Sequence, residues 1–186
     1  MSQSRAEQEA GRVLQQARTE YSALGEPWDN YRVDVDLVGS LLFGLGVQLV
    51  PDLRAGAREY AGFLDAESRL IAVEEHHHEH RRRFSVAHEI GHFVLHYLPE
   101  PGEGLFRCTQ GDMEVGAAVS GEGARLVHLR QESEANLFAG ALLMPESAVR
   151  AMATATRGRV DRLATHFGVS PQAMSIRLVR LGIKPH

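Results

Sequence analysis

The sequence predicts an α+β fold that is mostly helical, with a small antiparallel sheet and a helix-turn-helix-like pair of helices at the C-terminal end. Three observations support this prediction. Apolar residues recur at helical spacing in several long stretches. Two short apolar runs around a polar turn, within residues 60–74, have the pattern of a β-hairpin. Residues 163–178 read as a helix, a glycine-containing turn and a second helix.

Length and composition are those of a globular protein. The chain has 186 residues, of which 44% are hydrophobic and 24% charged. We expect one domain, residues 1–150, followed by a helical segment, residues 151–186, that packs on it. The formal net charge of −4 argues against wholesale binding to nucleic acid. The sequence has no signal-like or membrane-spanning apolar run, so a cytoplasmic location is expected.

The single cysteine, Cys108, excludes an internal disulfide and fits a reducing compartment. It lies in a glycine-rich stretch without a base at informative spacing, which makes it a weak candidate for a nucleophile.

The first part of the chain predicts packing elements. Residues 4–24 form an amphipathic helical pattern, and residues 36–45 form a second one. A short strand is predicted at Val47–Val50, stopped by Pro51, and the hairpin follows.

The second hairpin strand, Arg69–Glu74, is a candidate for the edge that holds an extended peptide by backbone pairing. Its possible substrate contacts are Arg69, Ile71 and Val73. The alternative is an ordinary covered strand.

Residues 75–80 contain four histidines, which favour a solvated linker over a second metal site because adjacent loop histidines define no single geometry. The following Arg81–Arg83 either attracts an acidic segment of a substrate or is the exposed start of a helix.

The strongest motif is His-Glu-x-x-His at residues 88–92. Residues four apart share one helix face, so His88 and His92 can direct two imidazoles at one metal ion. Glu89 is placed to act on water as a general base, as zinc-assisted hydrolysis requires. Gly91 weakens a helix interior by about 1 kcal/mol, which suggests that another backbone approaches closely there.

His96 continues this series but lies about 12 Å along the axis from His88, too far to share a cation with it. We expect it to be packed or hydrogen-bonded. Residues 99–125 are predicted to be loop, with a short strand possible at Met113–Val119. A lid and plain disorder both remain open for this stretch.

The third ligand is sought on the helix predicted at Leu126–Pro145. With Phe138 as the centre of its apolar stripe, Glu134 falls about 40° away and Glu132 about 120° away. Because a buried carboxylate needs a partner, Glu134 is predicted to bind zinc, and Glu132 to be a solvated surface charge. The alternative for Glu134 is a buried ion pair with an arginine.

Two segments, Arg82–His92 and Glu132–Pro145, resemble the ImmA/IrrE family of bacterial metallopeptidases. Members carry R-F-x-x-A-H-E-x-G-H and, later, E-A-N-x-F-A-x-x-L-L-M-P. The resemblance covers residues 35–180 and implies a zincin-like metallopeptidase domain. It implies that zinc is held by His88, His92 and Glu134 and that Glu89 is the general base. The glycine-rich stretch between the motifs is longer than in the family.

The family resemblance also implies a partner. Members cleave a helix-turn-helix repressor, or release it from DNA, and thereby switch on mobile-element or stress-response genes. The chain resembles the short anti-repressor type, without the C-terminal sensor domain. We therefore expect a zinc endopeptidase; the alternative is a non-cleaving, zinc-stabilised module that binds a repressor or DNA. The oxyanion helper is not fixed, and its candidates are His96, Tyr97 and His128.

The C-terminal segment is basic. From residue 151 it has six basic residues and one acidic residue, a net charge of +5, as a DNA-contacting helix-turn-helix would show. Packing on the peptidase core or docking of the substrate protein is the favoured interpretation.

Overall fold

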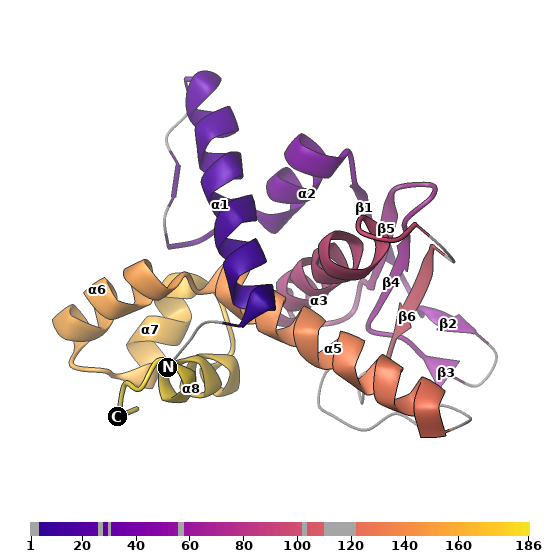
Figure 1. Ribbon diagram of the computed structural model, residues 1–186. Coiled ribbons are helices and arrows are strands. Elements are labelled where there is room, and N and C mark those ends of the chain that lie inside the picture. Colours follow the sequence, from indigo (N-terminus) through magenta and orange to yellow (C-terminus); the bar gives the residue numbers. More distant parts are fainter. Residues whose placement is uncertain (1–3, 26–27, 30, 56–57, 102–103, 110–121) are drawn as a thin grey trace.

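The computed structural model describes residues 4–25, 28–29, 31–55, 58–101, 104–109 and 122–186. The fold is mostly helical with a small four-stranded sheet and a separate two-stranded sheet, so the predicted α+β class is confirmed. Figure 1 shows the sheet on one side of the molecule and the C-terminal helices on the other, with α3 and α5 between them. The elements, in chain order, are α1 (Arg5–Ala23), α2 (Val35–Phe43), β1 (Gly46–Val50), β2 (Arg54–Ala55), β3 (Arg58–Glu59), β4 (Gly62–Asp65), β5 (Leu70–Glu74), α3 (Glu79–His92), the π-helical η1 (Phe93–Tyr97), β6 (Leu105–Cys108), α5 (Glu122–Leu143), α6 (Glu146–Thr156), α7 (Val160–Phe167) and α8 (Pro171–Arg180).

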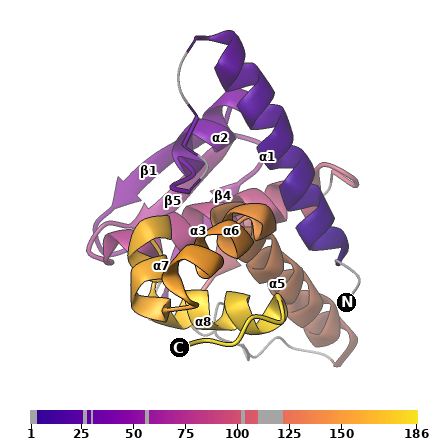
Figure 2. The same ribbon diagram turned by 90° about the vertical axis from the view of Figure 1, so that its left-hand side faces the viewer.

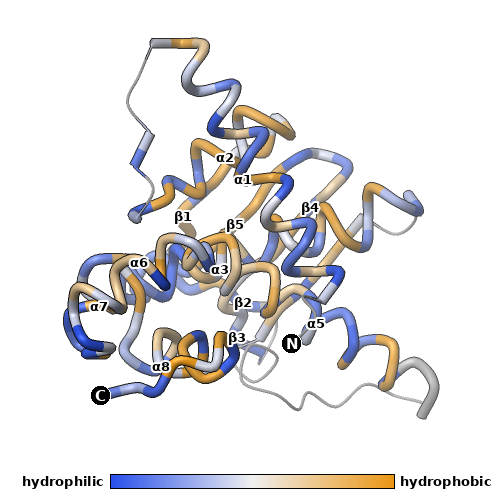
Figure 3. The backbone as a smooth tube through the Cα atoms, turned by 60° about the vertical axis from the view of Figure 1, so that its left-hand side comes forward, coloured by the Kyte–Doolittle hydropathy of each residue, from blue (hydrophilic) through white to orange (hydrophobic). Residues whose placement is uncertain are grey.

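The first helix shows how local sequence sets an element. Ser4 caps α1, and its hydroxyl accepts from the Glu7 backbone while the Glu7 carboxylate accepts from the Ser4 backbone. Its buried residues are spaced by three or four, and hydrophilic and hydrophobic residues alternate along it (Figure 3). The second helix ends where Gly44 adopts a left-handed φ of 65°.

The four-stranded sheet has the order β1-β5-β4-β6. The predicted hairpin forms, as β4 and β5 pair antiparallel, and β6 adds antiparallel to β4. β1 joins the other side of β5 in parallel, so the sheet is mixed and not wholly antiparallel as predicted. After β1, the next strand of this sheet along the chain is β4, which is not adjacent to β1. The hairpin then places β5 between β1 and β4, where β5 runs parallel to β1.

β5 lies inside the sheet, which corrects the prediction that it is an edge strand. Its backbone pairs with β1 on one side and β4 on the other. Ile71 and Val73 are fully buried, and Arg69 bonds to the carbonyl oxygen of Phe43. The three predicted substrate contacts on this strand are therefore structural, and the alternative of a covered strand is the correct one.

The stretch predicted to be loop at 99–125 contains β6 and the first turn of α5. β6 includes Cys108, so this cysteine is the buried last residue of a strand and does not lie in a loop. The strand considered at Met113–Val119 falls outside the described residues.

The C-terminal helices α6, α7 and α8 lie next to one another (Figure 2), and their buried residues belong to the common hydrophobic core. Helices α7 and α8 meet at Gly168, whose φ is 63°, as the predicted helix-turn-helix-like pair. Leu163, Phe167 and Met174 join the same buried cluster as α1 and α3. The predicted boundary at residue 150 lies inside α6, and the two-domain division remains a prediction.

None of the helices in the described part of the chain is long and apolar enough to cross a membrane.

Candidate metal centre

The two motif histidines lie side by side on the buried face of α3. His88 is fully buried and His92 is 1% exposed. Their Nε2 atoms are 3.0 Å apart, which means that both nitrogens converge on one point. The four-residue spacing on a helix produces this arrangement.

Glu132, on α5, supplies the carboxylate that meets them. Its Oε2 is 3.1 Å from His88 Nε2, and its Oε1 is 3.2 Å from His92 Nε2. The residue is 4% exposed.

The structure therefore corrects the prediction for Glu134, which does not reach the imidazoles of the motif. Glu134 accepts a hydrogen bond from Arg130 Nε at 3.0 Å and lies 3.9 Å from His96 Nδ1. The alternative, an ion pair with an arginine, is what forms, although the Arg130 side chain is 74% exposed and the pair is not buried.

The prediction of Glu134 from its angle to Phe138 failed because α5 packs against two helices, α1 and α3. The buried face of α5 is therefore wider than a single apolar stripe. Phe138 lies near the middle of that face, and Ala135 and Ala139 extend it by about 60° and 100° towards α3. Glu132 lies on this extension. The signal that could have found it is Ala135, which lies opposite Gly91, since small residues mark the closest contact between two helices.

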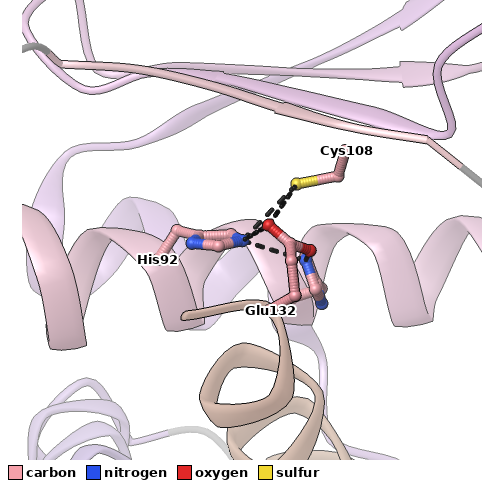
Figure 4. Close-up of side chains that lie close together, drawn as sticks. His92, Cys108 and Glu132 are labelled. Carbon is pink, nitrogen blue, oxygen red and sulfur yellow. Dashed lines mark hydrogen bonds and ion pairs between the residues drawn. The ribbon is translucent and has the colours of Figure 1, made fainter. Parts of the chain in front are cut away.

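Cys108 completes a cluster of four buried donor residues (Figure 4). Its Sγ is 3.4 Å from His92 Nε2 and 3.9 Å from Glu132 Oε1. The four ligand atoms lie within 4.8 Å of one another. Sequence reasoning missed Cys108 because the pairing of β6 with β4, which is not local, brings this residue to the site.

Asn136 orients the first histidine from outside the cluster. It lies one turn after Glu132 on α5, and its Oδ1 is 3.0 Å from His88 Nδ1. A proton on Nδ1 that donates to this oxygen leaves the Nε2 lone pair directed into the site.

Glu89 is buried beside the cluster and faces the sheet. Both carboxylate oxygens are buried without a nitrogen or oxygen donor among the described residues, and the nearby Cys108 thiol favours the ionised form. A Cβ on Gly62 of β4 would overlap Glu89 Oε1, so glycine is what allows this carboxylate to lie against the strand. Burial raises the pKa of Glu89 to about 7 in the metal-free protein.

The other ionisable groups of the site are shifted as well. Burial lowers the pKa of His92 to about 4. Burial opposes ionisation of Glu132, but the hydrogen bonds and charges of His88 and His92 outweigh it and hold the carboxyl pKa well below its usual range. Burial opposes protonation of His88, but the hydrogen bond to Glu132 and the nearby carboxylates outweigh it and raise the His88 pKa. Glu132 and His92 are thus already in the forms that bind a cation, whereas a cation would have to displace a proton from His88.

The donor set fits a small divalent cation. Nitrogen ligands at 2.0–2.1 Å from a tetrahedral zinc ion lie about 3.3 Å apart, and oxygen–nitrogen separations are similar. The observed separations of 3.0, 3.1 and 3.2 Å among His88, His92 and Glu132 are close to this value. The cluster could therefore hold a metal ion.

A cavity of about 370 Å³ borders the site between η1, β6 and α5. The three predicted oxyanion helpers line it, together with Glu132 and Arg107. His128 Nδ1 is 3.7 Å from Glu132 Oε1, whereas His96 Nε2 is 3.2 Å from the Gln131 carbonyl oxygen and acts in packing. Tyr97 stacks on Phe93.

The polar segment before α3 is structural. His78 caps α3 by accepting from the His80 backbone, and no second cluster of potential metal ligands occurs among the residues that the structure describes. Arg82 and Arg83 donate to the carbonyl oxygens of Glu75 and Val33. The guanidinium groups of these two arginines thus bind backbone atoms of the protein itself.

The comparisons agree with this site. A family model described as the IrrE N-terminal-like domain, of the peptidase M78 group, matches residues 45–179. No curated protein matches the chain. Among solved structures, a Mycobacterium tuberculosis transcriptional regulator has a TM-score of 0.57 and 20% identity, covering 90% of this chain. The match covers 46% of that regulator, so the chain spans about half its length, and the likeness establishes the fold alone.

Proposed function

Because the chain belongs to the peptidase M78 family of IrrE N-terminal-like domains, we propose that it is a zinc-dependent endopeptidase. The proposed ligands are the three residues whose donor atoms converge: His88, His92 and Glu132. The proposed general base is Glu89.

Zinc bound at such a site would polarise a peptide carbonyl and lower the pKa of water. Glu89 accepts the proton of the attacking water and passes it to the leaving amine. Asn136 holds His88 in the tautomer that directs Nε2 inward. His128 is the favoured oxyanion helper because it lies nearest to Glu132 in the bordering cavity.

One observation carries the proposal: the fully buried Glu89 carboxylate has no nitrogen or oxygen hydrogen-bond donor among the described residues. Burying an unsatisfied carboxyl group is unfavourable, and a site that only stabilises the fold has no use for it. Activation of a water molecule by Glu89 explains why such a carboxyl group lies beside the donor cluster.

The substrate is proposed to be a helix-turn-helix repressor, whose cleavage would relieve repression of mobile-element or stress-response genes. The family resemblance supports this, and a structural neighbour is a transcriptional regulator. Contact with DNA by α8 is not favoured because Arg177 is buried and pairs with Glu7 at 2.7 Å.

The substrate segment is proposed to be extended and to approach along β6. Among the described strands, β6 pairs only with β4 and is an edge of the sheet. It borders the 370 Å³ cavity, whose lining includes Glu132. An edge strand of this kind can bind a peptide by backbone pairing.

The alternative, a zinc-stabilised module that binds a repressor without cutting it, is favoured by Cys108, since four protein donors are typical of structural zinc sites. Glu89 argues against it.

The test is Glu89→Gln in the zinc-loaded protein. We expect one zinc per chain in both proteins and loss of cleavage only in the variant, because the amide keeps the shape but cannot accept a proton. The substrates to try are the helix-turn-helix proteins encoded beside the gene, with fragments identified by mass spectrometry.

A matched control is Glu134→Gln, which changes a carboxylate on the surface of the same region and should leave cleavage intact. Equal cleavage by wild type and Glu89→Gln would contradict the role of Glu89. A repressor that is bound but left intact by the wild type would favour the alternative.

A further inference from the structure

The inference concerns Cys108, the last residue of β6. Its side chain is fully buried and points from the strand towards His92 and Glu132 (Figure 4). β6 comes from a different part of the chain than α3 and α5, so three separate elements deliver the four donor residues.

The sulfur lies where a fourth tetrahedral ligand is expected. With zinc–sulfur bonds of about 2.3 Å and zinc–nitrogen bonds of 2.0–2.1 Å, tetrahedral geometry separates sulfur from nitrogen by about 3.5 Å and from oxygen by about 3.6 Å. The Sγ atom is 3.4 Å from His92 Nε2 and 3.9 Å from Glu132 Oε1. The first separation matches the expected value and the second exceeds it by about 0.3 Å, while all four donor atoms lie within 4.8 Å of one another.

Glu89 provides a second observation. Gly62, which the Glu89 carboxylate touches, is the direct partner of Cys108 in the β4–β6 pair. The buried carboxylate, which no nitrogen or oxygen donor of the described residues reaches, therefore lies beside the thiol. In the observed conformation, the sulfur is the group that faces both the donors and the base.

We propose that Cys108 is a fourth ligand of the metal centre and that this conformation is a latent form of the enzyme. The proposal rests on the proposed function. Catalytic zinc sites keep one position open for water or substrate, whereas four protein ligands close the site. Release of the Cys108 sulfur is then the step that admits water next to Glu89.

The fold allows this release without breaking the helical core. β6 is held in the sheet through β4 alone among the described strands, whereas His88, His92 and Glu132 lie on two long packed helices. A shift of β6 would withdraw the sulfur and leave the other three donors in place. Because β6 is also the proposed docking edge, the arriving peptide is the partner that would displace it.

The test replaces zinc by cobalt(II), whose thiolate complexes show a near-ultraviolet charge-transfer band. The chain has one cysteine, so any such band must come from Cys108. We expect the band in the wild type and its complete loss in Cys108→Ala and Cys108→Ser, with one cobalt still bound. X-ray absorption of the zinc-loaded wild type should show one sulfur scatterer, a measurement that stands even if a variant fails to fold.

Latency is tested with acetohydroxamate, a small chelating ligand that needs an open position. We expect it to shift the visible cobalt spectrum of Cys108→Ala at a concentration at least roughly tenfold lower than for the wild type. An equal response in both proteins would overturn the latent form.

Other outcomes separate this inference from the proposed function. Metal bound by nitrogen and oxygen alone would overturn the role of Cys108 and leave the peptidase proposal intact. Failure of the wild type to bind any divalent cation would overturn both. A sulfur ligand together with an absence of cleavage, even in Cys108→Ala, would support the coordination and contradict the peptidase and its latency.

Discussion

At the scale of single residues, the site depends on which of two neighbouring carboxylates faces α3. Glu132 and Glu134 are separated by one residue, hence by about 200° around the helix axis. One lies between two imidazoles, and the other is paired with a solvent-exposed arginine. A carboxylate held by two buried histidines is a ligand, whereas the second contributes little because exposed ion pairs are weak.

This contrast makes a direct prediction for metal affinity. Since loss of a partner outside the ligand set lowers affinity about 10–100-fold, Glu132→Gln should lower zinc affinity by roughly 100-fold or more. Glu134→Gln should leave zinc affinity unchanged. Competition with a chromophoric chelator measures both. A loss of affinity in Glu134→Gln equal to that in Glu132→Gln would contradict the assignment.

At the scale of elements, the site is made by the close approach of α3 and α5. Gly91 is the point of contact: a Cβ there would lie 3.2 Å from both Ala135 Cα and Phe138 Cδ1. Because the obstacle is largely backbone, it cannot rotate away. The glycine thus allows the approach that brings the histidines of one helix to the carboxylate of the other.

Gly91→Ala should therefore push the two helices apart. We expect a loss of about 1–3 kcal/mol in the free energy of unfolding of the metal-free protein from overpacking, and weaker zinc binding as well. The matched control is Gly140→Ala on α5, where only Met144 Cε lies within 4.0 Å. That change should be neutral or stabilise by up to about 1 kcal/mol through helix propensity. Urea unfolding separates the two; equal stability would show that the contact at Gly91 is not tight.

Whether an element could be predicted from the sequence depends on whether it is set by local spacing or by pairing with a distant strand. The helices α1, α2, α3 and α5 and the β4–β5 hairpin depend on local spacing of apolar residues, so their positions were predicted to within a few residues. β6 was missed because its four residues carry no strong alternation and it exists only through pairing with β4. The parallel pairing of β1 with β5 is likewise non-local.

The residues of the candidate site likewise divide into those set by local sequence and those set by the packing of distant elements. His88, Glu89 and His92 follow from one helical repeat, which local sequence contains. Glu132 and Cys108 depend on how distant elements pack, and a wheel centred on Phe138 assumed a single neighbour for α5. The acid was therefore misassigned by two residues, and the cysteine was set aside.

At the scale of the whole molecule, a buried ion pair joins the two ends of the chain. Arg177 on α8 contacts Glu7 on α1 at 2.7 Å and donates to the Met144 carbonyl oxygen at 3.0 Å. Both side chains are at most 10% exposed. The pair holds α8 against α1 and the end of α5, so the helix-turn-helix-like segment is anchored to the core that carries the site.

The pair should make stability depend on pH. Burial disfavours the ionised form of Glu7, but hydrogen bonds from the Ser4 backbone and from Arg177 outweigh it and lower the pKa to about 2 from 4.5. A carboxyl group with a lowered folded-state pKa contributes its stability above the unfolded pKa and loses it as pH falls towards the folded pKa. This contribution is therefore complete at pH 7 and declines between about pH 4.5 and pH 2.

Glu7→Gln removes this titration and leaves Arg177 without its counter-charge. We expect a loss on the order of 2 kcal/mol in the free energy of unfolding at pH 7. That loss should be clearly smaller at pH 3, because the wild type loses the same interaction there. Urea unfolding of the metal-free proteins measures it, and titration of the metal site cancels in the difference. Glu9→Gln is the control, since its partner Arg12 is 76% exposed and the pair should contribute little at either pH. A loss in Glu7→Gln that is the same at both pH values would mean that the carboxyl group of Glu7 is not held ionised by Arg177.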